Sequence, residues 1–219
     1  MQALLALIVA LGLQIAVNYS NDYSDGIRGT DDVRVGPIRL TASGLASAKA
    51  VKRAAFLSFG VACVAGLLLA AISSWWILIV GAISVLAAWG YTGGHTPYGY
   101  RGFGELSVFI FFGVVATVGT YYVQTLEFST AAFAASVSMG SLSCALLVIN
   151  NIRDRAQDAQ VGKKTLAVRL GDENARRFFI ALLALPYIFA PLTGNPLAFL
   201  TLASAPHALA TAREVRAGA

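Results

Sequence analysis

The first seventeen residues, MQALLALIVALGLQIAV (Met1–Val17), carry no charged side chain, whereas the next fifteen, NYSNDYSDGIRGTDD (Asn18–Asp32), carry four carboxylates. About 20 mostly apolar residues cross the hydrocarbon core of a bilayer as a helix. The first seventeen residues have neither the basic start nor the small-residue cleavage site of a secretory signal. It therefore predicts a membrane-spanning helix with an acidic cluster at its end.

The rest of the chain has the same apolar character. Of its 219 residues, 57% are hydrophobic and 12% charged, with a mean hydropathy of +0.69, whereas about 25% charge is usual for soluble domains. We therefore expect an all-α integral membrane protein, a helical bundle of about seven transmembrane helices in one domain over residues 1–219. The expected spans are 3–20, 54–72, 75–93, 106–124, 130–149, 178–193 and 196–212. Cys63 and Cys144 lie inside apolar spans, so no disulfide framework is implied.

The basic residues predict the orientation in the membrane. All sixteen Lys and Arg lie in four segments, which are 21–53, 94–105, 150–177 and 213–219. If the chain crosses the membrane seven times, these four segments all lie on one side of the membrane. The connections on the other side contain no basic residue. The positive-inside rule places the four segments in the cytoplasm of a multi-pass cell-membrane protein. The net charge of +5 follows from this topology, so we expect no nucleic-acid partner.

A second acidic cluster, NNIRDRAQD (Asn150–Asp158), follows the fifth expected span on the same side as the first. Residues three, four or seven apart share one face of a helix. This spacing predicts two helices that each present two carboxylates to a shared space. The residues with this spacing are Asn18, Asn21, Asp22 and Asp25 in the first cluster and Asn150, Asp154 and Asp158 in the second.

Four carboxylates around one space repel one another unless cations lie between them. Mg²⁺ binds one or two carboxylates, keeps several waters and takes further oxygens from substrate phosphates. We therefore predict that the four aspartates are catalytic Mg²⁺ ligands for a diphosphate whose departure the metal assists. Helix capping is the alternative for each cluster alone. Nearby cations available to the diphosphate oxygens are Arg28, Arg34, Arg153, Lys163 and Lys164.

The loop between the third and fourth spans offers further candidates. Tyr91, with Tyr98 and Tyr100, could place an aromatic face beside a developing cation, although an aromatic belt at the membrane interface is an equal alternative. Arg101 is the only basic residue of this loop and suits a substrate carboxylate or the diphosphate. His95 is better explained as a solvated interfacial side chain than as a base.

NDYSD and NNIRDRAQD, each after an apolar span, resemble the paired Asp motifs of the UbiA superfamily of intramembrane prenyltransferases. YTGGHTPYGYRGFGEL (91–106) and GKKTLAVRLGDENARR (162–177) resemble its menaquinone-pathway branch, the 1,4-dihydroxy-2-naphthoate polyprenyltransferases. The likeness runs over nearly the whole chain and implies a bundle of about nine helices that binds Mg²⁺-diphosphate at its cytoplasmic side. The matching motif positions are Asn21, Asp22, Asp25, Asn151, Asp154 and Asp158.

Two departures from this pattern stand out. Many members carry another carboxylate four residues beyond the Asp25 position, where this chain has Gly29. Asp31 and Asp32 are left open as its replacements. The expected seven spans, against about nine in the family, imply that the family's first and last helices lie outside this chain.

The resemblance implies transfer of a polyprenyl group from polyprenyl diphosphate to 1,4-dihydroxy-2-naphthoate with loss of CO₂, giving demethylmenaquinone. The alternatives are a prenyltransferase that acts on another aromatic acceptor such as 4-hydroxybenzoate, a cation-coupled transporter and a non-catalytic scaffold. A transporter usually places its carboxylates near the midplane of the membrane. The expected partners are the two substrates and the lipid bilayer, with no obligate protein partner. The expected substrate-binding residues are Asn18, Asn21, Arg28, Tyr91, Arg101, Asn150, Asn151, Arg153 and Lys163.

Overall fold

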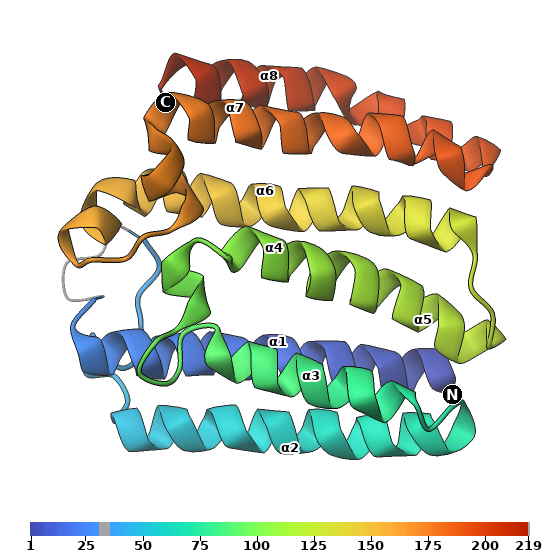
Figure 1. The fold of residues 1–219 in the computed structure, drawn as a ribbon, viewed down its shortest axis with the longest axis horizontal. Coiled ribbons are helices and arrows are strands. Elements are labelled where there is room, and N and C mark those ends of the chain that lie inside the picture. The colour runs from blue at the N-terminus through green and yellow to red at the C-terminus, as the bar shows by residue number, and fades with distance from the viewer. Residues whose placement is uncertain (31–35, 219) are drawn as a thin grey trace. The chain divides into compact units, whose positions relative to one another are not determined.

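The computed structural model describes residues 1–30 and 36–218. This part of the chain is helical and contains no strand (Figure 1), so the all-α prediction is confirmed. The predictions made for Asp31, Asp32 and Arg34 fall outside the described residues. The chain divides into two compact units, residues 1–100 with 123–126, and residues 101–122 with 127–219. Each unit has its own helices and its own acidic cluster.

The first unit is built on α1 (Gln2–Arg28), α2 (Ala48–Ile72) and α3 (Ile77–Gly90). Small residues let α1 and α2 approach closely, as is common for helices packed in lipid. Ala16 and Ala55 are wholly buried, and a Cβ on Gly12 would lie 3.0 Å from the Cβ of Ala62.

The first acidic cluster is part of α1 itself. The helix continues through Asp22 and Asp25 and ends where Gly29 adopts a left-handed conformation, with φ of 69°. Glycine is favoured there because it has no Cβ to clash. Gly29 therefore ends the helix at the position where the resemblance implies a further carboxylate. The predicted helical spacing of the first cluster is confirmed.

The second unit begins with one continuous helical segment, α4 (Gly104–Val108), the π-helical η2 (Phe109–Val115) and α5 (Ala116–Thr125). α6 (Thr130–Gln160) and α7 (Leu166–Phe189) follow, and α6 runs through the whole second acidic cluster. A Cβ on Gly113 would lie 2.6 Å from the Cα of Gly140, so glycine is needed where η2 crosses α6. The unit ends with η3 (Pro191–Thr193), η4 (Pro196–Ser204) and α8 (Ala205–Ala217).

Fewer helices than expected are long and apolar enough to span a membrane. Five in the described part of the chain qualify by length and composition, Gln2–Arg28, Ala48–Ile72, Gly104–Thr125, Thr130–Gln160 and Leu166–Thr193. α3, in the expected span 75–93, has only 14 residues, or about 21 Å of rise against a hydrocarbon core of about 30 Å. The expected span 196–212 is instead a 3₁₀ helix that passes into the more polar α8. Five of the seven expected spans therefore meet this measure within the described residues.

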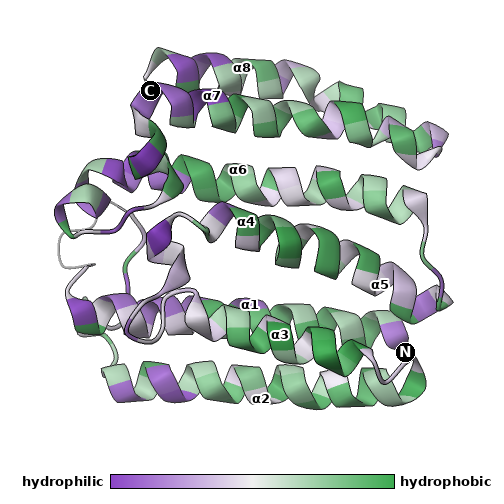
Figure 2. Ribbon diagram, in the orientation of Figure 1, coloured by the Kyte–Doolittle hydropathy of each residue, from purple (hydrophilic) through white to green (hydrophobic). Residues whose placement is uncertain are grey.

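Polar residues gather at one end of the long helices within each unit (Figure 2). In the first unit they occupy the end of α1 and the beginning of α2, and in the second the end of α6 and the beginning of α7. The intervening helix lengths are apolar, as a multi-pass membrane protein requires.

Candidate active site

Asp22 holds a loop against its own helix. Its buried carboxylate accepts the backbone N–H of Leu40 at Oδ2 and of Thr41 at Oδ1, each at 2.8 Å. One turn later, a Cβ on Gly26 would lie 2.5 Å from the Cβ of Thr41, so the loop lies directly on α1. A carboxylate has about four acceptor positions. Asp22 can therefore hold the loop and still bind a metal ion.

Asp25, one turn from Asp22, accepts a hydrogen bond from the hydroxyl of Tyr100. Burial, and next the negative charge of Asp25, raise the pKa of this phenol well above its usual value. Tyr100 therefore stays protonated and acts as a donor to the carboxylate. The guanidinium carbon of Arg28 lies 5.5 Å from the centroid of the same ring, within cation–π range.

Thr92 joins two of the predicted residues on α1. Its hydroxyl donates to Oδ1 of Asn21 at 2.7 Å, and its carbonyl accepts from Nη1 of Arg28 at 2.6 Å. The Nη2 of Arg28 donates to the carbonyl of Gly94. These bonds fix the 92–94 segment beside the first acidic cluster. Sequence reasoning missed Thr92, and its only signal was its position inside the YTGGH segment.

In the second unit, Asp154 is held by its sequence neighbour. Arg153 donates from Nε to Oδ1 at 2.7 Å and from Nη2 to Oδ2 at 2.8 Å. Asp158 lies one turn further along α6 and is buried. The backbone N–H of Lys163 donates to the carbonyl of Asp158 at 2.8 Å, which closes the turn after α6.

Asn151 on α6 donates from Nδ2 to Oε1 of Glu105 on α4 at 2.9 Å. Glu105 is buried, and its Oε2 has no hydrogen-bond partner among the described residues. Its carbonyl accepts from the thiol of Cys144 at 3.1 Å. Glu105, for which the resemblance implies a place lining the site, therefore positions a motif residue.

Three other predicted residues are exposed, and a fourth packs against a neighbouring ring. Asn18 is exposed and donates to the carbonyl of Gln14 at 2.8 Å. Asn150 and Arg101 are exposed. Tyr91 packs edge-on against Tyr98, with ring centroids 5.6 Å apart, which suits a structural role. Substrate binding by these residues stays a prediction.

The carboxylates suit a metal ion that is shared with a phosphate ligand. No group of three or more His, Cys, Asp or Glu side chains could hold a metal within residues 1–30 and 36–218. The acids instead occur as one pair on α1 and one pair on α6. One or two carboxylates are enough for Mg²⁺ when phosphate oxygens and water complete its shell. The donors therefore fit Mg²⁺-diphosphate.

An all-α membrane protein with an aspartate pair at the polar end of two of its helices has the features of an enzyme that handles lipid diphosphates. The chain belongs to the UbiA prenyltransferase family, whose sequence model matches residues 1–217. The resemblance identified from the two acidic motifs is thereby confirmed.

Several relatives have names that specify a reaction. The chain is 52% identical, over 99% of its length and 75% of the relative, to "1,4-dihydroxy-2-naphthoate octaprenyltransferase" of Mycobacterium tuberculosis. The protein of the same name in Mycobacterium leprae is 48% identical over 99% of this chain and 74% of the relative. The one in Escherichia coli is 42% identical over 83% of this chain and 61% of the relative. No solved structure matches.

Proposed function

We propose that the protein transfers a polyprenyl group from polyprenyl diphosphate to 1,4-dihydroxy-2-naphthoate with loss of CO₂, giving the hydroquinone (1,4-diol) form of demethylmenaquinone. The observation that carries this proposal is the identity of 52% over 99% of the chain to a relative named for this transfer. The two aspartate pairs at polar helix ends support it, because this reaction needs groups that bind a diphosphate.

The four aspartates are the proposed metal ligands, Asp22 and Asp25 on α1 and Asp154 and Asp158 on α6. When bound, Mg²⁺ neutralises the negative charge that develops on the diphosphate as its C–O bond to the allylic carbon breaks.

The chain's own residues orient these carboxylates. The neutral Tyr100 donates to Asp25, and Asp22 is fixed by two backbone N–H groups. Arg28 lies over the ring of Tyr100, the donor to Asp25, and Arg153 donates to Asp154. Both are the proposed cationic contacts of the diphosphate oxygens. Apolar helices exclude the water that would otherwise quench the allylic cation.

In the acceptor, a new C–C bond forms between the allylic carbon and the ring carbon that carries the carboxylate. The bond from that ring carbon to the carboxylate then breaks, CO₂ leaves, and its electron pair restores the aromatic ring. The active-site loops are proposed to face the cytoplasm, since the basic residues gather at the same helix ends as the aspartates.

The test uses membranes that contain the protein, Mg²⁺, a polyprenyl diphosphate and a panel of aromatic acids, with products identified by mass. We expect a prenylated naphthalenediol that has lost CO₂, formed only with 1,4-dihydroxy-2-naphthoate. Product formed only from 4-hydroxybenzoate would assign the protein to a different branch of the family. No product from any acceptor would contradict the transferase proposal.

A further inference from the structure

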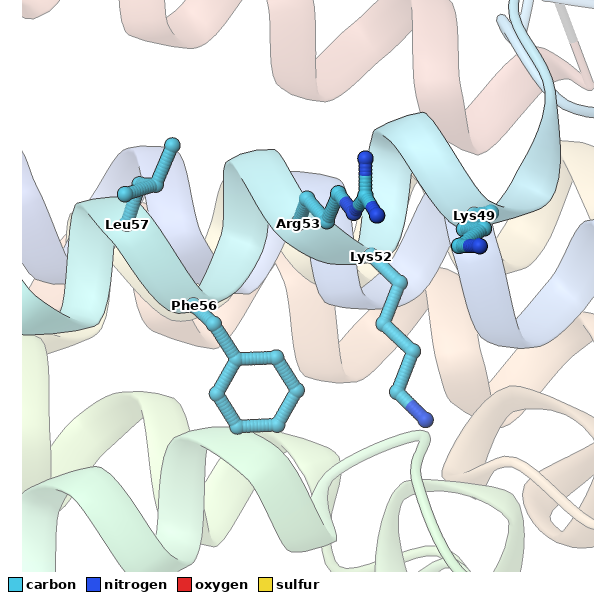
Figure 3. A pocket seen from close by; sticks show the side chains of 5 residues that line it. All are labelled: Lys49, Lys52, Arg53, Phe56 and Leu57. Carbon is cyan, nitrogen blue, oxygen red and sulfur yellow. The ribbon is translucent and has the colours of Figure 1, made fainter.

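A hollow of about 480 Å³ lies along the beginning of α2, away from the aspartate pairs in sequence. It is lined by two kinds of side chain (Figure 3). Lys49, Lys52 and Arg53 supply three cations, and Phe56 and Leu57, about one turn further along the helix, supply an apolar surface.

The three cations have no acidic partner among the described residues. The first turn of α2 carries no acid, and the Nζ of Lys52 lies above the ring of Tyr23, 5.3 Å from its centroid. Cations near a helix N-terminus are disfavoured by the helix dipole. No acid of the described residues therefore pairs with these three cations, and the hollow suits an anionic ligand.

The apolar half of the hollow is open. Phe56 is 53% and Leu57 72% exposed, although Phe56 packs on one side against Trp89, with ring centroids 5.1 Å apart. From Lys49 to Leu57 the helix rises about 12 Å. Over that distance the side chains of α2 change from charged to apolar. The whole helix is long and apolar enough to span a membrane.

We propose that this hollow binds an anionic phospholipid, with the headgroup phosphate between Lys49, Lys52 and Arg53 and an acyl chain against Phe56 and Leu57. A free phosphate or diphosphate matches only the charged half, whereas an anionic lipid matches both halves. Membrane topology accounts for basic residues at this helix end, but it does not require that three of them line one hollow with exposed apolar residues. The lipid of the cytoplasmic leaflet supplies such headgroups.

The first test compares lipids. The purified protein in a neutral detergent is titrated with phosphatidylglycerol or with phosphatidylcholine of the same acyl chains, and bound lipid is counted by native mass spectrometry. We expect retention of one phosphatidylglycerol at concentrations where phosphatidylcholine is lost. Equal retention of the two lipids would overturn the proposal.

The second test locates the binding. A variant with Lys49→Gln, Lys52→Gln and Arg53→Gln should bind phosphatidylglycerol at least about tenfold more weakly, because each basic group near an anionic lipid contributes measurably to binding. Each of the three single substitutions should weaken binding several-fold, which keeps the test valid if the triple variant fails to fold.

A matched triple variant removes the same charge elsewhere, by Arg177→Gln, Arg213→Gln and Arg216→Gln. It should bind phosphatidylglycerol like the unchanged protein. Equal loss in the two triple variants would show general attraction to net charge and would overturn the hollow as a site.

The last test separates a lipid from a free phosphate. Replacing Phe56 and Leu57 by alanine should weaken phosphatidylglycerol binding while leaving all three cations in place. Inorganic diphosphate should not displace the lipid when it is added at concentrations similar to those of the lipid. Displacement by diphosphate, with no effect of the two alanines, would make the hollow a phosphate site and contradict a lipid site.

Discussion

The two aspartate pairs differ in how they are held. On α1, Asp22 binds two backbone N–H groups of a loop and Asp25 binds the hydroxyl of Tyr100. On α6, the partners of Asp154 are the two guanidinium nitrogens of its neighbour Arg153. The first pair therefore stabilises the local fold as well as serving the proposed diphosphate. Asp154 forms no such bond to a distant segment among the described residues, so its proposed role is mainly toward the ligand.

The largest expected effect is on turnover and is common to both pairs. Asp22→Asn and Asp154→Asn should each lower prenyl transfer by about 10²–10³-fold, because each removes charge from a metal-diphosphate site. Initial rates of product formation measure this. Glu214→Gln, an exposed acid of α8, serves as the control and should keep its activity. Near-normal turnover in either aspartate variant would remove that residue from the site.

Stability should separate the two pairs. Asp22→Ala leaves the N–H groups of Leu40 and Thr41 without their acceptor and should cost about 3 kcal/mol of unfolding free energy. Asp154→Ala breaks a partly exposed pair with Arg153 and should cost less than about 1 kcal/mol. Denaturant unfolding in one detergent measures both. Equal losses would mean that Asp22 does not hold the loop.

The next largest effect on turnover is expected at Tyr100. Tyr100→Phe removes the donor to Asp25 but keeps the ring beside Arg28, so turnover should fall by about tenfold, as for loss of one hydrogen bond to a charged group. Normal turnover in this variant would show that Asp25 does not depend on the phenol.

The same variant should change how stability depends on pH. The pKa of Tyr100 is raised by burial and by Asp25, so the folded protein keeps this proton after the unfolded chain loses it. The contribution of Tyr100 to the free energy of unfolding is fully present below about pH 10, the usual pKa of tyrosine, and is lost as the pH rises above that value. The Tyr100→Phe variant should lose less stability there, and identical pH profiles would contradict this assignment.

The smallest effect concerns the support of α6. The Glu105→Gln variant keeps an acceptor for Asn151, so its turnover should stay within about twofold of normal. The Glu105→Leu variant leaves Asn151 without its partner, so its turnover should fall about fivefold. The ratio of the two rates is the measurement. If both variants behave alike, Glu105 does not position Asn151.

Helical spacing was enough to predict that Asp22 and Asp25 share a face of one helix, as do Asp154 and Asp158, because that regularity is local. The contacts of Thr92 and Tyr100 with α1 were not predictable, since they join residues far apart in the chain. Hydropathy located the apolar segments but not the ends of the helices within them, such as those of α3, because hydropathy does not register where a helix ends.

The proposed metal-diphosphate chemistry is tested most directly by measuring prenyl transfer as a function of free Mg²⁺. The unchanged protein in membranes is given polyprenyl diphosphate and 1,4-dihydroxy-2-naphthoate, first in excess chelator and then with Mg²⁺ restored in steps. We predict no product in chelator and recovery of turnover as Mg²⁺ rises, with Asp154→Asn failing to recover at any concentration. Full turnover in excess chelator would contradict the assignment of the four aspartates as metal ligands.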